Sequence, residues 1–301
     1  MADRKTREDA IIRGASFVRR RARPMDVALL NHRLGTAPKS AVIDQLARFQ
    51  NEDGGFGHGL EPDLPTPAST AIATSVALRH LGDIDAPADT FIVGRALNWL
   101  HSNFDWERGA WPIIDRAVDL APHAPWWNYG DDLAQRWNEF RYNPAGELLA
   151  ALYRYRESVE PNLVKIAEES LLSSLRSSPP TEAYDLRCAA KLMDAQHTPQ
   201  HLRSELEAAV LKAVGSHDQD DPHLPFLDIA TTPQSPIARA FPERIGPALG
   251  ALLAGQQPDG SWRPFWNWSD IDEAAWKKAE QEWCGILTRQ AVEVLMAYGG
   301  A

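Results

Sequence analysis

A seven-residue pattern occurs twice in the chain and constrains its fold more than any other feature. The first copy is Gln50-Asn51-Glu52-Asp53-Gly54-Gly55-Phe56, and the second is Gln256-Gln257-Pro258-Asp259-Gly260-Ser261-Trp262. Both copies place Gln, Asp, Gly and an aromatic residue in the same order and at the same spacing. Each copy lies between two stretches that have the apolar spacing of a helix. An internal repeat of this kind predicts a fold built by repeating one small unit.

The remainder of the chain has the apolar periodicity of helices and no strand-like alternation, which predicts an all-α protein. The helices come as hairpins, one buried and one amphipathic. We expect five to six such pairs to form one α/α toroid, a single domain over residues 1–301. Helices are expected at about residues 4–22, 27–35, 40–49, 68–81, 87–102, 143–156, 160–175, 182–195, 200–214, 236–256 and 274–298.

A long segment without helical periodicity, at about residues 103–142, interrupts this series. Irregular segments of this length are usually functional, so we expect a loop or lid here. It contains Pro122-His123-Ala124-Pro125-Trp126-Trp127, which is too apolar for a solvated loop. A second irregular segment, residues 216–235, is rich in Pro and Asp.

Composition excludes several classes of function. The formal net charge of -10 gives no electrostatic support for a nucleic-acid partner. The charged N-terminal residues lack an apolar signal region, and no apolar run is long enough to span a membrane. We therefore expect a cytoplasmic protein. The sequence does not indicate its oligomeric state.

The two repeats resemble those of the terpenoid cyclase and protein prenyltransferase superfamily, whose members fold as α/α toroids. Gly109-Ala110-Trp111-Pro112 looks like a degenerate third copy. The resemblance implies that Gln50, Asp53, Gln256 and Asp259 are structural, because Asp-Gly pairs favour turns and Gln can bind backbone at helix ends. For activity, it implies an enzyme acting on an isoprenoid or another small apolar substrate by general-acid or electrostatic chemistry.

The tail of the first repeat, which the second copy lacks, holds the candidate catalytic residues His58, Glu61 and Asp63. Pro62 favours an extended conformation for Glu61. Residues two apart in an extended segment face the same way, so Glu61 and Asp63 are expected to form a carboxylate pair. Two neighbouring carboxylates can keep one group protonated as a general acid. The alternative is that one of them caps the following helix.

Candidate substrate-binding residues come from two segments rich in tryptophan. His123, Trp126 and Trp127 belong to the long loop, and Trp266 and Asp270 follow the second repeat. Aromatic faces stabilise cations, which suits a carbocation intermediate, and they also stack on sugars. The alternative is that the loop plugs the cavity. Cations that can bind a diphosphate are Arg108, Arg116 and Arg263.

Two further motifs carry no functional prediction. Asp218-Gln219-Asp220-Asp221 is similar to the acidic motif of class II terpene cyclases, but Pro222 follows it where the family has a helix. Cys284 lies in a stretch similar to the zinc site of prenyltransferases, but Glu282 stands where that pattern has Asp. Cys188 is expected to be a buried helix residue. We expect no metal and no cofactor.

Three functions remain open at this point. The first is a terpenoid cyclase-like or prenyltransferase-like enzyme. The second is a carbohydrate-active α/α-barrel enzyme that uses the same carboxylates as acid and base. The third is a binding or scaffold module without catalysis, its cavity plugged by residues 103–142.

Overall fold

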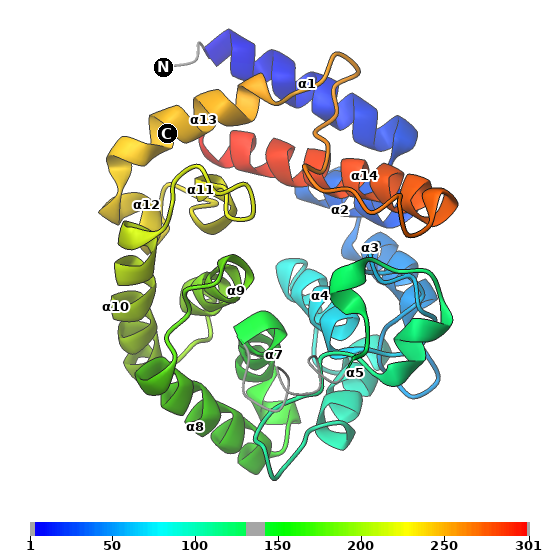
Figure 1. Ribbon diagram of the computed structural model, residues 1–301, viewed down its shortest axis with the longest axis vertical. Coiled ribbons are helices and arrows are strands. Elements are labelled where there is room, and N and C mark those ends of the chain that lie inside the picture. Colours follow the sequence, from blue (N-terminus) through cyan, green and yellow to red (C-terminus); the bar gives the residue numbers. More distant parts are fainter. Residues whose placement is uncertain (1–3, 131–141, 300–301) are drawn as a thin grey trace. The chain divides into compact units, whose positions relative to one another are not determined.

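The computed structural model describes residues 4–130 and 142–299, and this part of the chain is all-helical, with no β-strand (Figure 1). It consists of two compact units. Unit 1 contains residues 1–45 and 218–301, and unit 2 contains residues 46–217. The all-α prediction is therefore confirmed. The single-domain toroid stays a prediction.

The described residues of unit 2 form three helical hairpins (Figure 1). In each hairpin one helix packs on its partner, and α7 also packs on both α4 and α9. Helix α4 is buried on nearly every side because its residues are small or apolar almost all round. The pairs are α4 (Ala71–Asp83) with α5 (Phe91–Ser102), α7 (Tyr142–Arg154) with α8 (Pro161–Ser177), and α9 (Ala183–Asp194) with α10 (Gln200–Ser216).

Unit 1 joins residues from both ends of the chain. The long helix α14 (Glu273–Ala297) packs on α1 (Arg4–Arg21) and α2 (Pro24–Arg33). The core of unit 1 is formed by two apolar clusters that include Ala10, Ala15, Val18, Leu30, Trp262, Ala291, Val292 and Leu295. The remaining helices are α3 (Lys39–Leu46), α11 (Phe226–Ile229), α12 (Pro236–Ala240) and α13 (Pro242–Ala254).

The structure differs from the sequence-based expectation in several places, one of which is α11, inside the segment 216–235 that is expected to be irregular. The helix expected at residues 236–256 is two helices, α12 and α13, broken at Phe241 (φ -129°, ψ 55°). The residue before a proline is disfavoured in the helical region, and Pro242 follows here. The long segment after α5 contains two short 3-10 helices, Arg116–Leu120 and Pro125–Trp127. Residues 131–141 of the expected loop lie outside the described residues.

Both copies of the repeat fold into the same turn, one in each unit. Gln50 Nε2 donates to the carbonyl of Gly54 at 3.0 Å and to that of Ile92 in α5 at 2.9 Å. Gln256 Nε2 makes the matching bonds, to Gly260 at 3.1 Å and to Ala10 in α1 at 2.9 Å. The glutamine therefore ties the turn to a neighbouring helix in each unit.

The aromatic residue of each turn is fixed from its backbone. Phe56 N–H donates to Thr74 Oγ1 of α4 at 3.1 Å, and Trp262 N–H donates to Thr288 Oγ1 of α14 at 3.0 Å. The turn thus joins two helices in each unit: α5 and α4 in unit 2, and α1 and α14 in unit 1. In both units the repeat therefore has a structural role, which is to connect two helices through hydrogen bonds.

Candidate functional site

The predicted catalytic carboxylates lie in a turn between the first repeat and α4. Leu64 N–H donates to the carbonyl of Glu61 at 3.0 Å, which closes the turn around Pro62. Residues 61–64 therefore form a turn and not a continuous extended segment, so the carboxylate pair of Glu61 and Asp63 stays a prediction. Pro62 is the second residue of this turn, a position that suits the fixed φ of proline. Asp63 is only 3% exposed, whereas Glu61 is half-buried.

The N-cap of α4 is neither Glu61 nor Asp63. Helix α4 begins at Ala71, and Thr70 precedes it with an extended backbone. Thr70 Oγ1 accepts the N–H of Ala73 at 3.1 Å, which is the usual bond of an N-cap. Glu61 and Asp63 are thus not required to start the helix.

His58 belongs to the repeat turn. It is exposed, has a positive φ of 54°, and its Nε2 lies 2.7 Å from Asn51 Oδ1. Asn51 Nδ2 in turn donates to the carbonyl of Pro67 and to Ser69 Oγ. These hydrogen bonds make His58 part of the turn's own structure. They explain its position without any catalytic role.

The loop that carries His123 lies against the turn of Asp63. Ala124 N–H donates to the backbone carbonyl of Asp63 at 3.0 Å. His123 is buried, with Nδ1 2.6 Å from the carbonyl of Ala121 and Nε2 3.0 Å from Asn128 Oδ1. The structure therefore brings the turn of Asp63 and the His123 part of the long loop together.

The two adjacent tryptophans predicted to bind substrate, Trp126 and Trp127, have different environments. Trp127 packs on an apolar cluster of Leu64, Ile72, Ile113, Ile114 and Val118. Trp126 is 44% exposed. Trp127 therefore anchors the loop, and Trp126 is the aromatic ring that remains available to a ligand.

The other two predicted binding residues, Trp266 and Asp270, lie in unit 1. Trp266 makes edge-to-face contacts with Phe265 and Trp283, each with ring centroids 5.1 Å apart. Asp270 is exposed. These two residues belong to a different unit from Glu61 and Asp63, so they are not part of the group that unit 2 assembles.

The arginines proposed for diphosphate binding have local contacts. Arg108 pairs with Asp105 at 3.1 Å, and Arg116 lies over the ring of Tyr129 at 5.4 Å from its centroid. Arg263 is exposed and 4.0 Å from Asp259.

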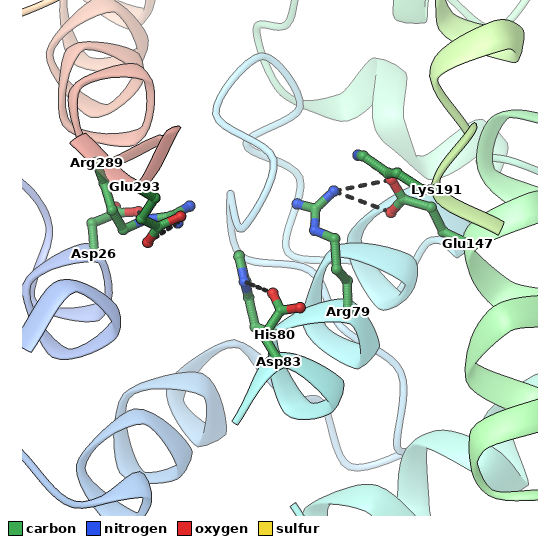
Figure 2. Close-up of polar contacts among 8 residues, drawn as sticks. All are labelled: Asp26, Arg79, His80, Asp83, Glu147, Lys191, Arg289 and Glu293. Atoms are coloured by element: carbon green, nitrogen blue, oxygen red, sulfur yellow. Dashed lines mark hydrogen bonds and ion pairs between the residues drawn. The ribbon is translucent and has the colours of Figure 1, made fainter. Parts of the chain in front are cut away.

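A buried ionic cluster in unit 2 was not predicted from the sequence (Figure 2). Glu147 of α7 is buried and accepts hydrogen bonds from Arg79 of α4, at 3.0 and 3.2 Å, and from Lys191 of α9. Burial alone would raise the pKa of Glu147, but the two cations outweigh it and hold that pKa at about 2. Glu147 is therefore ionised at neutral pH and cannot be a general acid.

Within the described residues, one carboxylate of this cluster, Glu147, binds two cations, Arg79 and Lys191. Arg79 and Lys191 are 26% and 33% exposed, so each keeps surface that a ligand can reach. Charge-assisted hydrogen bonds from such cations suit a carboxylate or phosphate. The sequence did contain a signal: Arg79 and Glu147 are charged residues inside otherwise apolar helices.

Unit 1 has a separate buried ionic network (Figure 2). Asp26 of α2 is fully buried and lies 2.9 Å from Arg23 Nε and 3.4 Å from Arg289 Nε. Arg289 Nη1 donates to both carboxylate oxygens of Glu293 at 2.9 Å. Since its charges are paired, we assign this network to holding α2 against α14.

The described residues contain no group of three or more His, Cys, Asp or Glu side chains placed to hold a metal ion. Within the acidic motif, Asp218 Oδ1 accepts the N–H of Asp220, and Asp221 Oδ1 accepts that of His223. These are turn contacts in an exposed loop. Across the described helices, none is both long and apolar enough to cross a membrane.

Comparisons with known proteins add no assignment. No protein-family model matches the sequence, and no curated protein matches it. Function has to be inferred from the residues themselves.

Proposed function

We propose that this protein is a terpenoid cyclase-like or prenyltransferase-like enzyme that acts on an isoprenoid, with Asp63 as general acid and Glu61 as its partner. The observation that carries the proposal is the position of Asp63. This carboxyl group is buried, and its turn is hydrogen-bonded to the loop that holds Trp126. A carboxyl group that is shielded from water, in a turn bonded to a loop that carries an exposed tryptophan, suits proton transfer to an apolar substrate.

The ionic cluster of unit 2 supports the same proposal. A prenyl diphosphate has an anionic head, and the exposed portions of Arg79 and Lys191 can donate to it. Glu147 keeps both cations in place before the substrate arrives.

The test is a product assay. Purified protein is incubated with geranyl, farnesyl and geranylgeranyl diphosphate and with squalene, and extracts are analysed by gas chromatography and mass spectrometry. We expect a product that Asp63→Asn reduces by about a hundredfold or more, the usual contribution of general-acid catalysis. Asp89→Asn, which changes an exposed aspartate of the same unit, should leave turnover unchanged. Full turnover by Asp63→Asn, or no product from any isoprenoid, would reject the proposal.

A carbohydrate-active enzyme is the second candidate, and the exposure of Trp126 favours it. Exposed tryptophan faces stack on sugar rings, and Glu61 and Asp63 would serve as acid and base. Release of reducing sugar from oligosaccharides, lost in Trp126→Ala, would establish this function in place of the first. Trp106→Ala, which removes another exposed tryptophan of unit 2, is the matched control.

A further inference from the structure

Unit 1 contains a hollow that the proposed function does not use. Its volume is about 920 Å³, and it is lined by α1, the second repeat turn and α14. Five cationic side chains line it: Arg13, Arg20, Arg21, Arg263 and Lys277. The carboxylates in the lining are Asp259 and Glu280. The hollow is therefore strongly basic, although the whole chain has a net charge of -10.

Three of these cations have no counter-ion in the described part of the chain. Among the residues that the structure describes, Arg20, Arg21 and Lys277 make no side-chain hydrogen bond or ion pair. Arg13 donates to Gln256 Oε1, and Arg263 is 4.0 Å from Asp259. Cations gathered in a concave surface raise the local concentration of anions, and guanidinium groups match phosphate geometry.

The corresponding place in unit 2 shows that the repeat alone does not create this basic hollow. There the hollow is about 490 Å³, and Asp53 and Asp115 are the charged residues that line it. Trp99 Nε1 donates to Asp53 Oδ2 at 3.1 Å, and the indole lies so close to Gly55 that a Cβ there would be 2.6 Å from it.

Unit 1 has different residues at the positions that correspond to Gly55 and Trp99. Ser261 replaces Gly55, and Phe17 takes the place of Trp99. This correspondence follows from the helices, because the carbonyls of Arg95 and Arg13 lie against Gly54 and Gly260, and Trp99 and Phe17 are each four residues further on. A phenyl ring has no N–H for Asp259. The basic residues are thus a property of unit 1 and not of the repeat itself.

We propose that this hollow binds a phosphate-bearing ligand. Arg20, Arg21 and Lys277 would bind the phosphate, and apolar residues of the lining would contact the rest of the ligand. Phe17 and Cys284 are buried in the lining, and Ile12 is 65% exposed within it. The same chemistry suits a soluble diphosphate or a phosphate headgroup of a lipid. The site is in unit 1, so it does not depend on Asp63 of unit 2.

Binding is tested without any assay of turnover, so its failure is distinct from failure of the proposed enzyme. Calorimetry with inorganic pyrophosphate examines the soluble ligand. Co-sedimentation with phosphatidylcholine vesicles, with and without phosphatidate, examines the headgroup. The double variant Arg20→Gln/Arg21→Gln should weaken binding about tenfold or more. Lys277→Gln should weaken it in the same direction, and high salt should weaken it further.

The matched control is Arg19→Gln/Arg33→Gln. It removes the same charge from exposed arginines of unit 1 that do not line the hollow. Its affinity should stay within about twofold of the unmodified protein. If Arg20→Gln/Arg21→Gln binds pyrophosphate more weakly and the control variant does not, the ligand is a soluble one. If the same difference is seen with phosphatidate vesicles, the ligand is a lipid headgroup. No binding of either probe, or equal loss in the two double variants, would overturn the proposal.

Discussion

At the scale of single residues, Glu147 shows how a buried charge is held. Its carboxylate joins α7 to α4 and α9 through Arg79 and Lys191. Removing one member of a buried ionic group leaves the others uncompensated, which costs several kcal/mol. The cost is lower here because both cations keep some contact with water.

We expect Glu147→Gln to lower the free energy of unfolding by about 2 kcal/mol, measured by urea denaturation at neutral pH. Glu169→Gln is the control, because Glu169 is exposed and 4.0 Å from Lys165. Surface pairs contribute little, so its effect should be below about 0.5 kcal/mol. Equal effects of the two variants would contradict the assignment of a buried cluster.

The same carboxylate predicts a pH dependence. Its pKa is about 2 in the folded protein against an ordinary value of 4.5. A lowered folded-state pKa gives stability that is complete above about pH 4.5 and is lost as pH falls toward 2. The difference in unfolding free energy between the unmodified protein and Glu147→Gln should therefore shrink across that window. A difference that stays constant with pH would contradict it.

Thr288 provides a second prediction at this scale. Its hydroxyl accepts the buried N–H of Trp262 and donates to the carbonyl of Cys284. Thr288→Val leaves that N–H without its acceptor, so we expect a loss of about 1–3 kcal/mol in chemical denaturation. Thr288→Ser keeps the hydroxyl and should lose less. A valine variant as stable as the serine variant would show that the hydroxyl is not needed.

The ionic cluster also marks what the sequence could not predict about the site. Arg79, Glu147 and Lys191 are 68 and 44 residues apart along the chain. Their pairing depends on which faces of α4, α7 and α9 meet, which helical periodicity within each segment does not specify. Asp63, in contrast, could be proposed from the sequence because it lies beside a recognisable turn, and its catalytic role stays a prediction.

At the scale of elements, the repeat turns depend on two glycines with positive φ. Gly54 has φ 96° and Gly260 has φ 93°. A Cβ would lie 2.4 Å from the carbonyl oxygen of Arg95 at the first position and 2.7 Å from that of Arg13 at the second. Only glycine adopts this conformation readily and allows so close an approach of another helix.

Replacing either glycine should therefore destabilise the unit that contains it. We expect Gly54→Ala and Gly260→Ala each to cost about 1–3 kcal/mol, measured by thermal and chemical unfolding. Gly250→Ala is the control, because Gly250 is exposed in α13 and a Cβ there meets nothing within 4 Å. That variant should be stabilised by up to about 1 kcal/mol. A neutral result at Gly54 and Gly260 would contradict the role of the turns.

The helices themselves were largely predictable because most have a clear apolar face. The expected segments 182–195 and 200–214 match α9 and α10 to within two residues at each end. The break at Phe241 was missed, although Pro242 signals it, because apolar periodicity continues across it. Helix periodicity identifies elements well and their interruptions poorly.

At the scale of the whole molecule, the two units differ in how the chain builds them. Unit 2 is continuous in sequence, and unit 1 requires residues 1–45 and 218–301 together. The apolar residues of α14 that form its core pack against residues of α1 and α2. Most helix stability in proteins comes from such packing and not from the helix alone.

We therefore expect a fragment of residues 218–301 to lack a cooperative thermal transition in circular dichroism. Adding a separate peptide of residues 1–45 should restore one, because it supplies the missing core. A peptide with Val18→Asp, which places a charge in that core, should fail to do so. Cooperative unfolding of residues 218–301 by themselves would contradict the expectation.

Each unit contains one of the two cysteines, so the rate at which each thiol is alkylated reports on the opening of its own unit. Cys188 lies in α9 of unit 2 and Cys284 in α14 of unit 1, and burial is the main cause that raises their pKa values to about 12 and about 11. Since the thiolate is the reactive form, both should resist alkylation near neutral pH until their surroundings open. Mass spectrometry of peptides alkylated over time will then show which half of the protein opens first, with no label added to the chain.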